Sequence, residues 1–253
     1  ENIRGAEMAA EEAGYTLIVV DSRESSAREQ QAIAKIIDGA EGLILTSPRM
    51  SSAGILGIAK QRPVVVLNRE VGGLPSVLTN GGRGAGLSAE HLANLGHDEI
   101  TYVAGPKASW ADGGRWRGLE EAAASLDVTV RRIGPNSPTL AGGARAASRW
   151  LEHPSTGVIA FNDMMAIGFM RQIGVEGFEV PRDVSVIGFD NSRTALLVDP
   201  GLTSVASPLA QQGAAAVKTL LAAVGGLRLP EKPLYLPVRL VERGTTARAR
   251  SNR

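Results

Sequence analysis

Short runs of consecutive apolar residues, many of them β-branched, recur along the chain and alternate with stretches that have helical spacing. In Val64–Leu67, apolar residues follow one another without the polar alternation of a strand that faces water on one side. Ile33, Ile36 and Ile37, in contrast, fall on one face of a helix. Strands buried on both faces are typical of parallel sheets covered by helices. The pattern therefore predicts a doubly wound α/β fold.

The alternation extends over most of the chain and yields more strands than one sheet holds comfortably. We therefore expect two α/β lobes. Strands are predicted for residues 16–21, 42–46, 64–67, 76–79, 100–104, 128–133, 157–161 and 184–189, with a further apolar run at 202–205 and an extended segment at 234–241. Helices are predicted for residues 26–38, 83–95, 114–126, 140–153, 164–173 and 209–224.

Three positions are candidates for crossings between the lobes. They lie near residues 79–80, 206–208 and 236–237, where turn-forming residues separate predicted elements. The N-terminal lobe then comprises residues 1–79 and 208–236, and the C-terminal lobe comprises residues 80–207 and 237–253. Because the chain would cross three times, both lobes are discontinuous, and we expect a cleft between them.

The composition narrows the classes of function. The chain has 253 residues, with 27 Lys and Arg against 26 Asp and Glu, so its net charge is only +1. So small a charge gives no field to hold nucleic acid, and these residues alone are not expected to form a DNA-binding module. The chain has no Cys, which excludes disulfide scaffolds and thiolate catalysis. No run approaches the ~18 apolar residues of a membrane span, so no membrane partner is expected.

Motifs of well-known catalytic and cofactor chemistry are absent from the sequence. No Lys follows Gly, which excludes a GxxxxGK[ST] phosphate loop. No Ser has Gly at both i−2 and i+2, as a nucleophile elbow requires, and no His has metal-ligand spacing. The pattern Gly84-x-Gly86-x-x-Ala89 matches a relaxed dinucleotide fingerprint, but Gly86 falls inside a predicted helix, where packing explains it better. We therefore expect neither a cofactor nor a metal.

Polar side chains follow the carboxyl ends of several predicted strands, which is the edge where open α/β sheets bind ligands. One such residue means little, and for Asn162 helix capping is an equally good interpretation. Amide, carboxylate, guanidinium and indole groups together suit a polyhydroxylated ligand, because they supply donors, acceptors and an aromatic face. The candidates are Asn68, Asn80, Ser109, Trp110, Arg115, Asn162 and Asp190.

Six segments along the chain match a set of family motifs in the right order. Residues 180–190, Val-Pro-Arg-Asp-Val-Ser-Val-Ile-Gly-Phe-Asp, are similar to vPxDvsviGfD, and residues 161–168, Phe-Asn-Asp-Met-Met-Ala-Ile-Gly, are similar to xNDxmAxG. The other segments are residues 84–100, 104–119, 200–205 and 236–246. In these motifs the chain resembles the effector-binding core of the LacI (lactose repressor) family of bacterial transcription regulators.

This resemblance implies a periplasmic-binding-protein-like fold of type I, with two doubly wound lobes joined by a three-crossover hinge. It implies an effector bound between the lobes, and a homodimer that transmits lobe movement to N-terminal helix-turn-helix heads on operator DNA. Trp110 would either stack on the effector or lie at the surface, and Ser207, which stands at the hinge, is an eighth candidate for contact with the effector. By motif position, the effector contacts include Asn68, Asn80, Ser109, Arg115, Asn162 and Asp190, with Arg115 as a bidentate donor.

Several features depart from the family pattern. Asn68 stands where the family often has Asp, and Ser207 stands where Gln is frequent. Residues 129–139 contain no aromatic side chain that could cover the effector. The family's first strand and DNA-binding head are missing, and we expect both upstream of Glu1, because sheet edges would otherwise stay unpaired. Residues 54–60 and 196–202 are candidates for the dimer surface.

Three classes of function compete. The leading hypothesis is the sensing core of a cytoplasmic, dimeric regulator, in first place a repressor, that binds a sugar or related polyol, with nucleosides ranked behind these. The alternative is a periplasmic sugar-binding protein of an ABC transporter, because the two classes share the fold and the cleft. An α/β enzyme that uses Asp163 or Asp190 is the third hypothesis, although the sequence does not give the separation of these carboxylates. The closing Arg-Gly-Thr-Thr at 243–246 favours the regulator.

Overall fold

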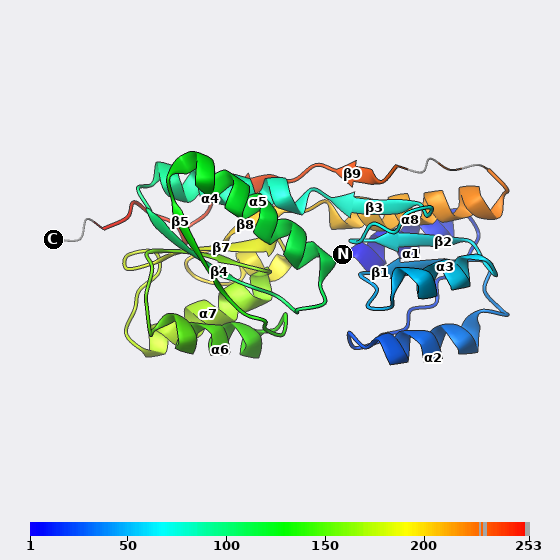
Figure 1. The fold of residues 1–253 in the computed structure, drawn as a ribbon, viewed down its shortest axis with the longest axis horizontal. Helices are drawn as coiled ribbons and strands as arrows, with labels where there is room; N and C mark the ends of the chain where they lie inside the picture. The colour runs from blue at the N-terminus through cyan, green and yellow to red at the C-terminus, as the bar shows by residue number, and fades with distance from the viewer. Residues whose placement is uncertain (228, 230–231, 251–253) are drawn as a thin grey trace. The chain divides into compact units, whose positions relative to one another are not determined.

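The computed structural model describes residues 1–227, 229 and 232–250, which form two compact units (Figure 1). Unit 1 comprises Glu1–Thr79 and Pro208–Pro237, and unit 2 comprises Asn80–Ser207 and Val238–Arg253. Pro237, which the boundaries from the sequence place in the C-terminal lobe, is the last residue of unit 1. The reason is that the strand directly before it pairs with a strand of unit 1.

A parallel sheet in the order β1-β2-β3-β9 forms the centre of unit 1. On one face, Val66 packs with Ile33 and Ile55. On the other face, Val65 packs with Ala216. Every residue of β2 is buried, as its unbroken apolar run predicts. The elements are α1 (Asn2–Glu12), α2 (Ser26–Ile36), β1 (Leu43–Thr46), α3 (Ser52–Ala59), β2 (Val64–Leu67), β3 (Ser76–Thr79), α8 (Leu209–Val224) and β9 (Leu234–Leu236).

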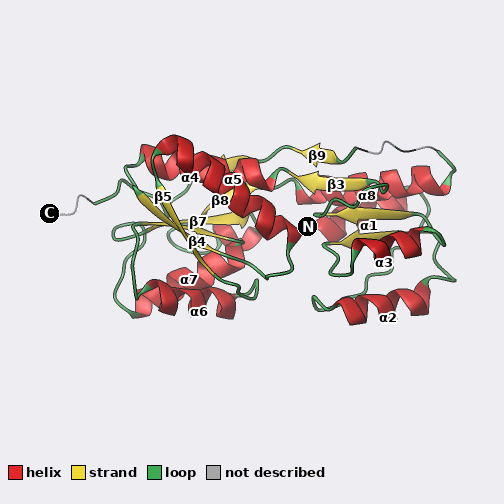
Figure 2. Cartoon of the chain, viewed as in Figure 1, coloured by secondary structure: helices red, strands yellow, loops and turns green. Residues whose placement is uncertain are grey.

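Unit 2 contains a larger sheet in the order β10-β8-β7-β6-β4-β5, in which only β10 is antiparallel to its neighbour. Helices α4 and α5 cover one face and α6 and α7 the other (Figure 2). Ile159 packs with Leu119 on the first face, and Val158 packs with Trp150 and Phe169 on the second. The elements are α4 (Gly81–Asn94), β4 (Glu99–Val103), α5 (Trp110–Leu126), β5 (Thr129–Ile133), α6 (Leu140–Trp150), β6 (Gly157–Ala160), α7 (Asp163–Val175), β7 (Ser185–Asp190), the 3-10 helix η1 (Arg193–Leu196), β8 (Thr203–Ala206) and β10 (Arg239–Val241).

The prediction of a doubly wound α/β fold is confirmed, because each sheet carries helices on both faces. Several boundaries differ from those expected by a few residues, and two of these differences have a local physical cause. Helix α5 begins at Trp110 and not at Gly114, because the side chain of Ser109 caps it by accepting a hydrogen bond from the Asp112 amide. The extended segment 234–241 divides into β9 and β10 around Pro237, which has no N–H to donate to a ladder.

The prediction of a strand at residues 16–21 is wrong, since this segment pairs with no strand in the part of the chain that the structure describes. The side chains of Ile18, Val19 and Val20 are 70%, 56% and 50% exposed. Among the strands that the structure describes, β1 pairs with β2 alone. A groove of about 930 Å³ lies between the other edge of β1 and the segment. The apolar pattern of the segment is that of a strand, but a strand is stable only when its backbone groups have a partner.

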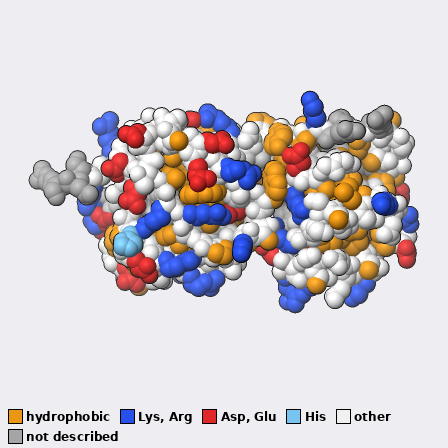
Figure 3. Space-filling view, viewed as in Figure 1, with side chains coloured by type: hydrophobic (Ala, Val, Ile, Leu, Met, Phe, Trp, Pro, Cys, Tyr) orange, Lys and Arg blue, Asp and Glu red, His pale blue; other side chains and the backbone are white. Residues whose placement is uncertain are grey.

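On the face drawn in Figure 3, acidic and basic side chains are interspersed over unit 2, in line with the net charge of +1. None of the helices described is long and apolar enough to cross a membrane. Within residues 1–227, 229 and 232–250, no group of acidic or His side chains is arranged to hold a metal ion.

Candidate functional site

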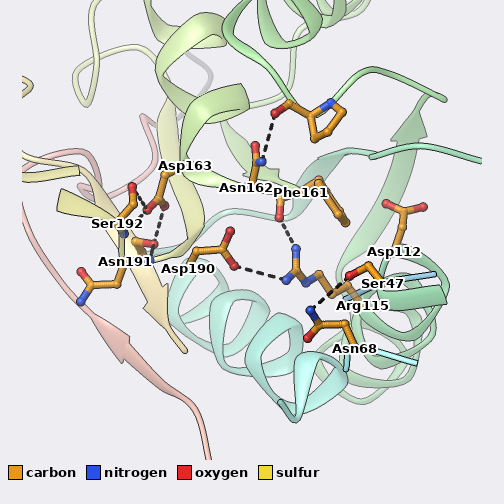
Figure 4. A network of polar contacts seen from close by, with 12 residues as sticks. Ser47, Asn68, Asp112, Arg115, Phe161, Asn162, Asp163, Asp190, Asn191 and Ser192 are labelled. Atoms are coloured by element: carbon orange, nitrogen blue, oxygen red, sulfur yellow. Dashed lines mark hydrogen bonds and ion pairs between the residues drawn. The ribbon is translucent and has the colours of Figure 1, made fainter. Parts of the chain in front are cut away.

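Arg115, on the second turn of α5, is the centre of a polar cluster in unit 2 (Figure 4). Its side chain is only 8% exposed, and its Nη1 donates to the backbone carbonyl of Phe161. Its Nη2 lies 3.5 Å from the carboxylate oxygen Oδ1 of Asp190. The guanidinium carbon lies 3.7 Å from the ring centre of Phe189 and 4.6 Å from that of Phe161. Two aromatic rings and a carbonyl therefore fix the plane of the guanidinium.

The Arg115–Asp190 pair keeps hydrogen-bonding capacity that the protein does not use. Nε of Arg115 is buried and has no hydrogen-bond partner among the residues described. The Asp190 side chain is 31% exposed, so its carboxylate can accept further hydrogen bonds. Burial raises the pKa of Asp190, and the Arg115 guanidinium acts against that increase. The pair offers a donor and an acceptor that a hydroxyl-rich molecule can satisfy.

Three of the predicted site residues cap helices. Asn162 caps α7, because its Oδ1 accepts from the amide of Met165 at 2.9 Å, while its Nδ2 donates to the carbonyl of Pro138 at 3.3 Å. Asn80 caps α4 by accepting from the Arg83 amide at 3.0 Å. Ser109 caps α5 in the same way. The structure therefore shows the capping role that was one of the two interpretations of Asn162. Contact of these three residues with an effector stays a prediction.

The remaining predicted site residues have different surroundings. Asn68 belongs to unit 1, where its backbone has a φ of 59° and its Nδ2 donates to Oγ of Ser47 at 3.1 Å. Trp110, predicted to lie in a loop, is the first residue of α5 and is 37% exposed. Oγ of Ser207 is buried without a hydrogen-bond partner among the residues described, and contact of this hydroxyl with a ligand stays a prediction. Of the eight candidates, Arg115 and Asp190 are in direct contact.

The sequence interpretation missed the residues that support this pair. Phe161 and Phe189 directly precede Asn162 and Asp190, and an aromatic residue at each of two strand ends is a signal that could have identified them. Asp163 was considered only as an acid or base. In the structure it is 1% exposed, and the backbone and side chain of Ser192 both donate to it.

The dinucleotide fingerprint does not describe a phosphate site. Gly84 lies inside α4, where an added Cβ would come within 2.7 Å of the Phe189 ring and 2.8 Å of Val205. The absence of a side chain at Gly84 therefore lets the helix approach the sheet. This is the packing role that the sequence analysis preferred.

The chain was compared with known protein families and with solved structures. The model of the periplasmic binding protein-like domain matches residues 89–246. The chain belongs to this family. A solved LacI family transcriptional regulator from Enterococcus faecium, with bound ribose, superposes with a TM-score of 0.87 at 28% identity, over 98% of this chain and 94% of that one.

Curated relatives of this periplasmic binding protein-like chain are transcription regulators. It is 36% identical over 173 residues to the regulator MalR of Streptomyces coelicolor, which covers 66% of this chain and 50% of the relative. It is 28% identical over 254 residues to the repressor CytR of Escherichia coli, which covers 97% of this chain and 74% of the relative. The resemblance to LacI-family regulators is thereby confirmed, although the chain spans about half the length of MalR.

Proposed function

We propose that the chain is the ligand-sensing core of a LacI-family transcription regulator and that it binds a small sugar-like effector against Arg115 and Asp190. The observation that carries this proposal is the fixed Arg115 guanidinium, with an unused buried Nε, beside a partly exposed carboxylate. Vicinal hydroxyls of a sugar or polyol accept from a guanidinium and donate to a carboxylate. The two flanking phenyl rings add apolar surface for the C–H face of a sugar.

The relatives support a regulator over a transport protein. MalR and CytR are both named as HTH-type regulators, and the Enterococcus regulator holds ribose. By this analogy the effector is a sugar or related polyol, ahead of a nucleoside, and the protein acts in the cytoplasm as a homodimer. Operator DNA would be bound by an N-terminal helix-turn-helix head, in keeping with the near-zero net charge of the present chain. A periplasmic sugar-binding protein is the alternative.

A binding role fits the two carboxylates better than an enzymatic one. Asp163 is 1% exposed and accepts hydrogen bonds from Ser192 and Ser204, so it cannot reach a substrate. One carboxylate oxygen of Asp190 faces the Arg115 guanidinium, so the carboxylate is held as a hydrogen-bond acceptor beside a fixed donor. We therefore propose that the chain is not an enzyme.

The test is a thermal-shift screen of the purified chain with sugars, polyols and nucleosides, D-ribose among them. A binder raises the unfolding free energy by about 2.7 kcal/mol at a hundredfold excess over its dissociation constant. The variant Arg115→Ala should lose this stabilisation. Arg182→Ala should keep it, because that guanidinium lies on the surface of unit 2, where it pairs with the carboxylates of Glu179 and Asp183.

Two results would contradict the proposal. The first is a screen in which no compound stabilises the wild type, and the second is equal stabilisation of Arg115→Ala. Recovery of the bound compound after incubation separates binding from catalysis. Unchanged compound is expected, and its conversion to a product would favour the enzyme.

A further inference from the structure

The carboxylate of Asp163, the first residue of α7, is fully occupied by donors from two other elements. Its Oδ2 accepts from the backbone amide of Ser192 at 2.6 Å and from the Ser192 hydroxyl at 2.9 Å. Its Oδ1 accepts from the hydroxyl of Ser204 on β8 at 2.6 Å. One buried side chain thus joins the start of α7 to β8 and to the turn that follows β7.

That turn has a backbone conformation that needs support. Asp190 has a φ of 98° and Asn191 a φ of 51°, so two successive residues with side chains occupy the left-handed half of the φ range. Such conformations cost of order 1 kcal/mol or more each and persist only where surrounding contacts hold them. Since the turn begins with Asp190, its conformation determines where that carboxylate lies.

The backbone amides of Asn191 and Ser192 are both connected by hydrogen bonds to the Asp163 carboxylate. The amide of Ser192 donates to Asp163 directly. The amide of Asn191 donates at 3.0 Å to Oγ of Ser204, and Ser204 in turn donates to Asp163. If Asp163 were absent, the Ser192 amide would lose its acceptor and the Ser204 hydroxyl would lose the group that orients it.

The residues next to Asp163 connect it to the other half of the pair. Phe161, Asn162 and Asp163 are consecutive, and the carbonyl of Phe161 accepts from Nη1 of Arg115 (Figure 4). The segment 161–163 therefore contacts Arg115 at one end and the Asp190 turn at the other. The segment therefore connects the side chain of Arg115, on α5, to that of Asp190, at the end of β7.

From these contacts we propose that Asp163 is a positioning residue that holds the turn 190–192, and with it the Asp190 carboxylate, in place for Arg115. It acts through the turn and does not touch the effector. The proposal stands on contacts within unit 2 and deepens the proposed function, because effector binding at this pair would depend on it.

Amide hydrogen exchange, followed by NMR on the whole chain, tests the proposal without any effector. In Asp163→Ala, exchange at both Asn191 and Ser192 should accelerate by about tenfold to a hundredfold. In Ser204→Ala, the acceleration should be confined to Asn191, because the Ser192 amide keeps its direct bond to Asp163. A general loss of stability would not produce this division between two neighbouring amides.

The matched control is Asp112→Ala, which removes the carboxylate of another buried aspartate of unit 2. That carboxylate accepts from the Gly105 amide at 2.7 Å, so exchange should accelerate at Gly105 and not at Asn191 or Ser192. Asp163→Asn, of nearly unchanged volume, serves if Asp163→Ala does not fold. Wild-type exchange at Ser192 in both Asp163 variants would overturn the proposal.

A calorimetric titration with D-ribose connects the positioning to binding. If D-ribose binds the wild type, its affinity should fall about tenfold or more in Asp163→Asn, and equal affinity would overturn the role in binding. If D-ribose does not bind, that result counts against the proposed function for this sugar, while the exchange data alone decide the positioning role. The two failures are therefore distinguishable.

Discussion

Nη2 of Arg115 and Oδ1 of Asp190 lie 3.5 Å apart, at the outer limit of a hydrogen bond. Each group is held by other contacts: Arg115 by the Phe161 carbonyl and two rings, and Asp190 by the turn attached to Asp163. The pair is therefore oriented without being saturated. Such preorganisation would reduce the loss of conformational entropy if the pair binds a polar ligand, as we propose.

Arg115→Lys should weaken binding of the strongest compound from the screen by about tenfold or more. Lysine keeps the positive charge, but it lacks the planar fork that bonds to Phe161 and Asp190 and the face that stacks on Phe189. Isothermal titration calorimetry measures the change, with Arg182→Lys as the control for an exposed arginine of unit 2. An unchanged affinity in Arg115→Lys would mean that charge alone is needed.

The free energy of unfolding should contain a component from Asp163 that decreases as pH rises. Burial raises the pKa of Asp163 from 3.8 to about 6, so between these values the folded chain binds a proton that the unfolded chain has released. This component is complete below the unfolded pKa and is lost as pH rises through about 6. Between pH 5 and 7.5 it amounts to about 1.4 kcal/mol.

Chemical denaturation of the wild type and of Asp163→Asn at a series of pH values isolates this component. His91 and His97 titrate in the same range with the opposite sign, because burial lowers the pKa of both, and they are present in both proteins. The wild type should lose stability relative to the variant from pH 5 to 7.5. A difference that stays constant with pH would refute the raised pKa of Asp163.

Gly118→Ala should lower the free energy of unfolding by about 1 to 3 kcal/mol, the usual cost of overpacking. An added Cβ at Gly118 of α5 would lie 2.4 Å from the Cα of Gly82 in α4, where only backbone can move. Gly114→Ala, one turn earlier in the same helix, is the control, because nothing lies within 4 Å of its added Cβ. It should be neutral or stabilising by up to about 1 kcal/mol. Equal effects in denaturant titrations would contradict this account of the α4–α5 contact.

Gln212→Ala should destabilise unit 1 by about 1 to 3 kcal/mol. The Gln212 side chain is fully buried, and its Nε2 donates to the carbonyl of Val77 and to Oδ1 of Asn68, each at 2.9 Å. Its loss leaves both acceptors without this donor. Gln211→Ala, at the exposed neighbouring position, should change stability by less than about 0.5 kcal/mol in the same denaturation assay. Similar values for the two variants would contradict the buried network.

The sequence was sufficient for elements whose pattern depends on their own residues. Four consecutive apolar residues predict the doubly buried β2, and the stripe at Ile33 and Ile36 predicts α2. The sequence was insufficient for a segment whose structure depends on pairing with another strand. Residues 16–21 have the composition of a strand, but no local pattern reveals whether a neighbouring strand is there to pair with them.

The candidate site shows the same division. Polar residues at strand ends identify Arg115 and Asp190 as ligand candidates, because the carboxyl edge of a parallel sheet is a general binding position. The role of Asp163 depends on Ser192 and Ser204, which lie 29 and 41 positions away in the chain. Asn162 is ambiguous from sequence for a physical reason, since the amide that caps a helix is also the amide that would bind a hydroxyl.

The most direct test of the central claim is a crystal structure of the chain with the strongest compound from the screen. We expect hydroxyl oxygens of that compound within about 3.2 Å of the Arg115 guanidinium and the Asp190 carboxylate, with its carbon skeleton against Phe161 or Phe189. A compound that binds elsewhere and leaves Arg115 and Asp190 without ligand contacts would contradict the assignment of this pair as the effector site.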